Sequence, residues 1–218
     1  MNFPGITQFY LFCYNISMQK IVIGIDEVGR GSLAGPVVAA AFCMVGKPRL
    51  RAIGDFDSKK LTPRWREDLY EILTRHPDVE WGIGKVSERQ IDRINILQAT
   101  RLAMRKAFLS LRRKLVKREV KPSLVIVDGR TLLDIPVPQR ALPHADATIF
   151  FCMASSIIAK VTRDRLMTRY HKKYPRYGFN RHKGYGTPYH LQALKKYGPC
   201  SIHRLSFTPC KQMQGVIK

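Results

Sequence analysis

The chain has 218 residues, of which 45% are hydrophobic and 25% charged, a balance that excludes a mainly disordered protein. Its 38 Lys and Arg against 16 Asp and Glu give a formal net charge of +22, which favours a polyanionic partner, most simply nucleic acid. No apolar run approaches the roughly 20 residues that a membrane-spanning helix needs, so no membrane partner is expected.

Residues 1–19 carry no charged side chain, so they lack the positive start of a signal peptide. We interpret them as an extension, with Met18 as the native start; an apolar strand or a partner-binding arm is the alternative. The five cysteines are odd in number and form no CxxC pair, which excludes a complete disulfide framework and argues against zinc. A cytoplasmic location is therefore expected.

Strands and helices are expected to alternate along the rest of the chain, which predicts an α/β fold with a mixed sheet. Strands are predicted at 20–26, 36–45, 79–86, 123–128 and 140–142. Helices are predicted at 63–75, 95–115, 150–174 and 187–197. Asn95 is expected to cap the second helix, and Thr187 followed by Pro188 opens the last. The tail from Gly198 is predicted to be a loop.

Charge divides the chain unevenly. From Lys160 to Lys218 there are 14 Lys and Arg and one acidic residue, Asp164, a net charge of +13. We predict a catalytic domain at 20–174, and a small basic C-terminal helical subdomain with its tail at 175–218. An acidic residue in the basic second half suggests a specific role, although a helix cap or a salt bridge accounts for any single one.

Acidic residues follow two of the buried strands. Asp26 ends the first strand and Asp128 ends the fourth, so neighbouring strands would bring both carboxylates to one edge of the sheet, with Asp146 as a third candidate. Clustered carboxylates repel one another unless a divalent cation lies between them, and oxygen ligands favour Mg²⁺ or Mn²⁺. Two such cations about 4 Å apart can activate water for phosphodiester cleavage. Because adjacent side chains alternate, Glu27 must reach this site from a turn, act through its carbonyl, or serve elsewhere.

Gly29, Arg30 and Gly31 follow the same strand. Glycines at such a place usually only turn the chain. In the functional interpretation, bare backbone lets a sugar–phosphate approach closely. The chain has neither GxGxxG before a helix nor GK[ST], which disfavours a nucleotide-binding loop.

Basic and aromatic residues of the second half are candidates for nucleic-acid contact. Ser156, Lys160 and Arg163 share one helix face with Asp164, either as a surface salt-bridge face or as a row of phosphate contacts. Tyr185 lies within HKGYGT and can stack on a sugar or base, although spacing alone favours a buried core tyrosine.

Together these motifs resemble ribonuclease HII from about residue 21 to 209. The resemblance rests on GIDEVGRGSLAGPVVAAA, DSKKLTPRWRE, LVIVDG, ASSIIAKVTRDR, HKGYGTPYHLQAL and HRLSF, in this order. It implies a ribonuclease H-like fold, with a mixed five-stranded sheet flanked by helices and a helical C-terminal appendage. The sister type, ribonuclease HIII, would show GKG in place of Gly29-Arg30-Gly31.

The resemblance also implies an activity and its residues. The activity is divalent-metal hydrolysis of RNA in RNA·DNA hybrids and at single ribonucleotides in duplex DNA, leaving 5′-phosphate and 3′-hydroxyl ends. Asp26, Glu27, Asp128 and Asp146 match the four acidic metal-site positions. Gly29, Arg30 and Gly31 match the sensor of the ribose 2′-OH, and Tyr185 matches the tyrosine on the adjoining deoxyribose. Before Asp146, where the family usually has Lys-Gly, this chain has His144-Ala145.

We therefore expect a monomeric endoribonuclease in which Mg²⁺ or Mn²⁺ is the cofactor. Lys59, in the loop 54–61, and the basic C-terminal region are expected to hold phosphates of the RNA·DNA hybrid or the ribonucleotide-containing duplex DNA. Two alternatives remain at this point: a non-catalytic duplex-binding protein, and a resolvase- or integrase-type nuclease that cuts DNA alone.

Overall fold

A computed structural model describes residues 21–46 and 62–213, so Met18 and Lys59 lie outside the described residues. Its sheet has five strands in the order β3-β2-β1-β4-β5. The strands are β1 (Ile21–Val28), β2 (Val37–Met44), β3 (Val79–Val86), β4 (Pro122–Asp128) and β5 (Gln139–Leu142). The pairs β1–β2 and β2–β3 are antiparallel, whereas β1–β4 and β4–β5 are parallel. The predicted mixed five-stranded sheet is confirmed.

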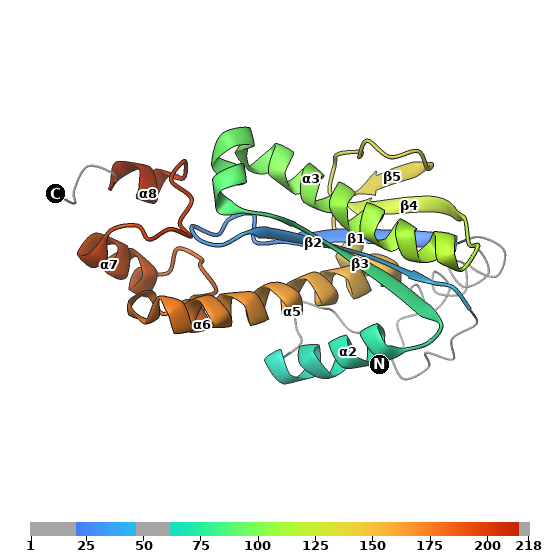
Figure 1. Cartoon of the computed structure of the whole chain (residues 1–218), viewed down its shortest axis with the longest axis horizontal. Coiled ribbons are helices and arrows are strands. Elements are labelled where there is room, and N and C mark those ends of the chain that lie inside the picture. The colour runs from blue at the N-terminus through green and yellow to red at the C-terminus, as the bar shows by residue number, and fades with distance from the viewer. Residues whose placement is uncertain (1–20, 47–61, 214–218) are drawn as a thin grey trace.

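Helices cover both faces of this sheet (Figure 1). They are α2 (Pro63–Arg75), α3 (Glu88–Lys117), α4 (Ala145–Thr148), α5 (Phe150–Lys173), α6 (Phe179–His182), α7 (Pro188–Tyr197) and α8 (Thr208–Gln212), with the 3₁₀ turn η1 (Pro175–Tyr177). One apolar core lies between the sheet and α3, and another lies between the sheet and α2 with α5. Within the described part of the chain, no helix is long and apolar enough to cross a membrane.

A third core joins the C-terminal helices to the glycine-rich loop after β1. Tyr177, Phe179 and Leu194 pack in it together with Leu33 and with Met167 near the end of α5. In Figure 1 these helices, α6 to α8, lie at one end of the molecule, beyond the sheet. The C-terminal segment is thereby fixed beside the carboxyl end of β1.

Several predicted boundaries are confirmed and others are corrected. The helix at 63–75 and the strand at 79–86 have the predicted bounds. Asn95 accepts a hydrogen bond from the amide of Gln98 at 3.1 Å, as the predicted cap should. The helix nevertheless begins earlier, at Glu88, and the non-helical φ of 64° at Asn95 marks a kink within α3. The prediction that the tail is a loop is wrong at Thr208–Gln212. These residues form α8, which buries Cys210.

Glycines allow the central helices to approach the sheet at backbone distance. A Cβ built on Gly24 of β1 would lie 2.2 Å from the carbonyl carbon of Phe151 in α5. On the other face, a Cβ on Gly84 would lie 1.9 Å from the carbonyl oxygen of Ala103 in α3. Both obstacles are helix backbone, which cannot rotate away as a side chain can. These two residues therefore set the spacing between the helices and the sheet.

We predict that Gly24→Ala lowers the free energy of unfolding by about 1–3 kcal/mol, because the added methyl group must push α5 away from β1. Urea denaturation measures this loss. Gly31→Ala is the matched control, since a Cβ at Gly31 meets nothing within 4 Å. Equal stability of the two variants would contradict the close packing of α5 on β1.

Candidate active site and nucleic-acid interface

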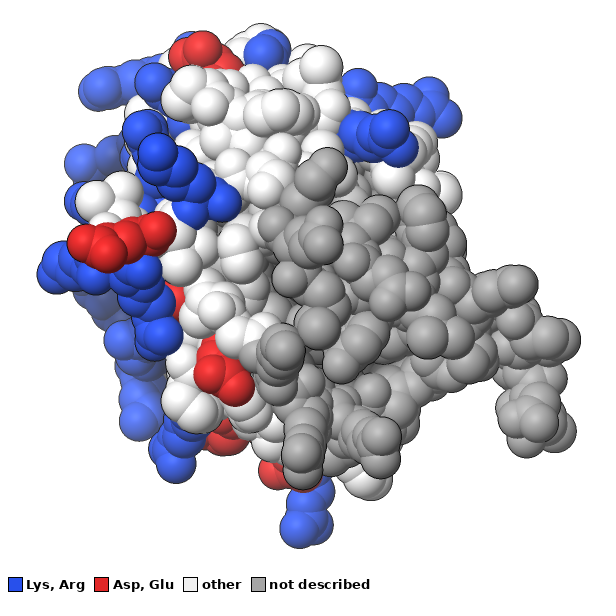
Figure 2. Space-filling view, turned by 90° about the vertical axis from the view of Figure 1, so that its right-hand side faces the viewer, with Lys and Arg blue, Asp and Glu red and all other residues white. Residues whose placement is uncertain are grey.

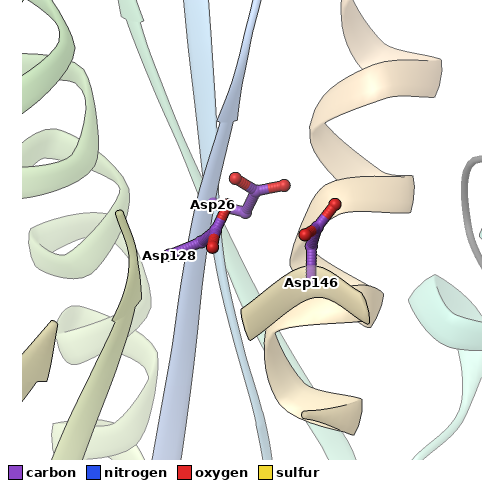
Figure 3. A group of neighbouring side chains, drawn as sticks. All are labelled: Asp26, Asp128 and Asp146. Carbon is purple, nitrogen blue, oxygen red and sulfur yellow. The ribbon is translucent and has the colours of Figure 1, made fainter. Parts of the chain in front are cut away.

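Three acidic side chains converge beside the carboxyl ends of β1 and β4. Asp26 comes from β1, Asp128 from the end of β4 and Asp146 from α4. One carboxylate oxygen from each lies within 4.8 Å of those of the other two, and Figure 3 shows the three side chains in one group. Asp26 and Asp146 are buried, and Asp128 is half-buried. The convergence that the sequence predicted is present.

Local structure explains how the three acids meet. The parallel register pairs Ile25 with Val127, so the next residues, Asp26 and Asp128, lie side by side. A carboxylate oxygen of Asp128 accepts a hydrogen bond from the backbone N–H of Ala145 at 2.7 Å, which fixes the start of α4 and hence the next residue, Asp146. The unusual His144-Ala145 pair leaves Asp146 in the cluster.

The negative charges at this site repel one another. Burial, and then the neighbouring charges of Glu27 and Asp128, hold the pKa of Asp26 well above its ordinary value. Hydrogen bonds from the hydroxyl of Ser156 and from the amide of Glu27, the latter at 2.7 Å, act in the opposite direction. A divalent cation would relieve this repulsion, and carboxylate oxygens are suitable ligands for one.

Glu27 lies beside the group of three. Its carboxylate is 3.4 Å from the guanidinium of Arg30. Burial raises the pKa of Glu27, and the charge of Arg30 partly offsets this. The charge of Asp128 also raises that pKa, so the two carboxylates are electrostatic neighbours.

The two glycines of the Gly29-Arg30-Gly31 loop serve different purposes. Gly29 is buried and has a φ of 91°, and a Cβ there would lie 2.2 Å from Nε of Arg163. Conformation and packing therefore both require glycine at this position. Gly31 is exposed and has open space where a Cβ would be, so no described contact requires glycine there.

A buried arginine that the sequence interpretation missed holds this loop. Arg204 is fully buried, and its guanidinium donates to the carbonyls of Gly29 at 2.6 Å and Arg30 at 2.8 Å. It also donates twice to the carbonyl of Gly35, at 3.0 and 2.9 Å. The sequence did contain a signal for Arg204. It lies in the HRLSF motif, which supported the resemblance to ribonuclease HII but was given no role.

Arg163 corrects a prediction. It is fully buried, and its guanidinium donates to the carbonyls of Ala34, Pro36 and Lys183 at 3.0, 3.0 and 2.8 Å. A side chain so enclosed does not form part of an exposed phosphate-binding face, so that prediction is wrong for Arg163. Instead it connects the glycine-rich loop to the segment that carries Tyr185, whose ring centroid lies 5.6 Å from the guanidinium carbon.

The other residues predicted to contact nucleic acid differ in their exposure and in their partners. Lys160 is half-buried and pairs with Asp164 at 2.9 Å, which is the salt bridge of the alternative interpretation. Ser156 bonds to Asp26, as described above. Tyr185 is 36% exposed, so the interpretation of a buried core tyrosine is wrong.

Positive charge also lies away from the C-terminal region. The outer face of α3 exposes Arg105, Lys106, Arg112 and Arg113. Figure 2, which views the right-hand end of Figure 1, shows Lys and Arg side chains gathered along one side, with acidic side chains scattered among them. The excess of basic residues is therefore not confined to the C-terminal region.

Comparison with known proteins agrees with the fold. A family model described as Ribonuclease HII matches residues 23–210. The chain is 49% identical to Ribonuclease HII of Chlamydia trachomatis serovar D over 88% of this chain and 83% of that protein. It is also 49% identical to Ribonuclease HII of Syntrophobacter fumaroxidans, over 90% and 80%. The crystal structure of ribonuclease H2 from Pyrococcus horikoshii aligns with a TM-score of 0.72 and 30% identity, covering 90% of this chain and 98% of that one.

The fold and these matches define the class of protein as a ribonuclease H, an endonucleolytic hydrolase with a mixed five-stranded sheet flanked by helices. Within that class, the chain belongs to the ribonuclease HII family.

We predict that Asp26→Asn makes the metal-free protein more stable. The substitution removes one of the mutually repelling charges and keeps an oxygen that can accept the hydrogen bond from the backbone N–H of Glu27. The melting temperature should rise by about 2–4 °C for each kcal/mol of repulsion relieved. Thermal unfolding in EDTA measures this. Asp134→Asn is the control: its side chain is 88% exposed and forms a surface ion pair with Arg105 at 3.6 Å, a kind of pair that contributes little to stability, so the melting temperature should stay nearly unchanged. A lower melting temperature for Asp26→Asn would contradict the account of repulsion.

Proposed function

We propose that this enzyme hydrolyses the RNA strand of RNA·DNA hybrids and cleaves on the 5′ side of single ribonucleotides in duplex DNA. The products are a 5′-phosphate and a 3′-hydroxyl. The observation that carries the proposal is the group Asp26, Asp128 and Asp146, in which Asp26 lies on the strand that leads directly into Gly29-Arg30-Gly31. A site for phosphodiester chemistry thereby lies close to exposed backbone that can contact a sugar.

The proposed ligands of the metal are Asp26, Asp128 and Asp146, with Glu27 assisting from beside them. Their donor set is all oxygen, which suits Mg²⁺ or Mn²⁺. When bound, such ions activate water and stabilise the leaving oxygen in phosphodiester hydrolysis. The protein holds the carboxylates together for this chemistry. The register of β1 and β4 sets Asp26 beside Asp128, and the hydrogen bond from the backbone N–H of Ala145 to Asp128 fixes the start of α4.

Specificity requires a reader of the 2′-OH, because that group distinguishes RNA from DNA. We assign this role to the backbone of Gly29, Arg30 and Gly31. Tyr185 is proposed to pack on the adjoining deoxyribose, a contact for which its exposed ring supplies area. Arg204 fixes the carbonyls of Gly29 and Arg30, and Gly31 adds exposed backbone with open space beside it for the sugar.

Phosphate contacts are proposed for Lys59, Lys160 and Ser156, and the hydroxyl of Ser156 must turn away from Asp26 to donate to a phosphate. Binding of duplex should then weaken with salt, by about 0.9 log units per neutralised phosphate for each decade of salt concentration. We propose a monomer in the cytoplasm, and the free thiols of the four described cysteines support a reducing compartment.

The substrate is tested with three duplexes of one sequence: DNA with a single ribonucleotide, all-DNA, and an RNA·DNA hybrid. With Mg²⁺ or Mn²⁺, we expect cleavage of the first and third only, and 5′-phosphate ends on the products. EDTA should abolish cleavage, as should Asp128→Asn, while Asp134→Asn stays active.

Two outcomes would contradict this proposal. Equal cleavage of the all-DNA duplex would exclude reading of the 2′-OH and favour a nuclease that cuts DNA alone. Undiminished cleavage in EDTA would exclude the role of the metal.

We further predict that the two loop glycines separate stability from activity. Gly31→Ala should leave the melting temperature unchanged and lower kcat/KM on the single-ribonucleotide duplex about tenfold or more, because its methyl group projects into the space proposed for the sugar. Gly29→Ala should instead destabilise the fold by about 1–3 kcal/mol, since its φ of 91° is strained for alanine. Wild-type kcat/KM for Gly31→Ala would contradict the assignment of Gly31 to substrate contact.

A further inference from the structure

The segment that carries Tyr185 is an irregular loop held from several sides. Lys183 and Gly184 have φ values of 52° and 87°, which turn the chain sharply before Tyr185. The carbonyl of Gly184 accepts a hydrogen bond from the amide of Leu33 at 2.8 Å. The Tyr185 ring projects from this loop and is partly exposed, so its direction depends on how the backbone at 184–185 is fixed.

His190 of α7 holds the backbone of Tyr185 directly. It is fully buried, and its Nδ1 lies 2.9 Å from the carbonyl oxygen of Tyr185. A carbonyl can only accept, so Nδ1 of His190 carries the proton and donates it. In a neutral ring the other nitrogen, Nε2, is then an acceptor. It lies 3.0 Å from Nε2 of His203.

His203 completes the second half of this arrangement. Its Nδ1 lies 2.8 Å from the amide nitrogen of Cys200, which can only donate, and 3.3 Å from the carbonyl oxygen of Cys200, which can only accept. The amide contact is the shorter one, and the acceptor Nε2 of His190 requires the proton on Nε2 of His203, so this Nδ1 is unprotonated. Nε2 of His203 therefore carries the proton and donates to His190. Each bond thus has one donor and one acceptor, which assigns a single tautomer to each ring. The backbone of His203 also bridges to Ala34 in the glycine-rich loop.

The surroundings keep both rings neutral. Burial lowers the pKa of His190 to about 4 and, together with the neighbouring His190, that of His203 to about 3. The rings are packed among Phe179, Tyr177 and a third histidine, His182, whose ring stacks on His190 at 4.4 Å. At neutral pH both histidines therefore remain uncharged hydrogen-bonding groups, and neither is available to a substrate.

We propose that His203 and His190 form a neutral hydrogen-bond relay from the amide of Cys200 to the carbonyl of Tyr185, and that this relay positions the Tyr185 ring for nucleotide contact. The proposal rests on the proposed contact between Tyr185 and the substrate. His190 and His203 are positioning residues, because they act only through Tyr185. The relay connects the C-terminal segment, α7 and the substrate-facing loop.

Two substitutions of His190 separate its two hydrogen bonds. Asparagine places an amide nitrogen near the position of Nδ1, whereas glutamine places one near Nε2. We expect His190→Asn to retain a KM for the single-ribonucleotide duplex within about twofold of wild type, and His190→Gln to raise KM several-fold. In both, kcat at saturating duplex should change less than KM. His76→Gln, at a histidine between α2 and β3, is the control and should leave both parameters unchanged.

A double-mutant cycle distinguishes positioning of Tyr185 from a general structural role. Tyr185→Ala should raise KM about tenfold, in line with the loss of a stacking contact. Adding His190→Gln to Tyr185→Ala should then raise KM no further. If the double variant raises KM by the product of the two single-variant factors, His190 does not act through Tyr185. The relay is then overturned, while the contact of Tyr185 with the substrate stands. If Tyr185→Ala has wild-type KM, the proposed contact itself fails, and the relay proposal fails with it.

A second measurement does not depend on whether the variants fold. ¹⁵N NMR of the imidazole nitrogens in the unsubstituted enzyme reports which nitrogen carries the proton. We expect His190 as the Nδ1–H tautomer and His203 as the Nε2–H tautomer at pH 7. The opposite tautomer at His190, or a doubly protonated ring, would overturn the relay.

Discussion

Electrostatic repulsion among three carboxylates that share one small volume is the constraint on which the rest of the structure depends. Asp26, Asp128 and Asp146 offer oxygens within 4.8 Å of one another, and burial together with the charges of Glu27 and Asp128 raises the pKa of Asp26. Flexible elements would let the three side chains move apart. Two parallel strands in fixed register hold Asp26 beside Asp128, and the bond from Ala145 to Asp128 ties α4 to the sheet.

A second layer of structure holds the loops around this cluster. Arg163 and Arg204 are fully buried, and within the described residues neither forms an ion pair with a carboxylate. Backbone carbonyls of the glycine-rich loop accept their hydrogen bonds instead. A buried guanidinium is stable only when its donors are satisfied, so the loop conformation and the arginine conformations require each other. The segments around Gly29, Lys183 and Arg204, far apart in the sequence, are thereby held as one unit beside the acids.

The sequence was most informative where local pattern determines structure. The β-branched strands, the Thr187 cap and the acids at the strand ends were predicted correctly, because each depends on near neighbours along the chain. Arg163 was placed on an exposed face because its helical spacing sets it beside Ser156, Lys160 and Asp164. Its burial depends on carbonyls more than 120 residues away, at Ala34 and Pro36, which no spacing pattern reveals. The short helices α4, α6 and α8 were missed for a related reason, since tertiary contacts rather than periodicity define them.

The central claim is that the scaffold holds repelling carboxylates together so that they can bind a divalent cation. Calorimetric titration of Mn²⁺ into the substrate-free enzyme tests this most directly, with Asp26→Asn and the exposed control Asp134→Asn titrated in parallel. The account predicts Mn²⁺ binding by the wild type and by Asp134→Asn, and binding weakened at least tenfold in Asp26→Asn. Equal Mn²⁺ affinity in the wild type and Asp26→Asn would contradict it.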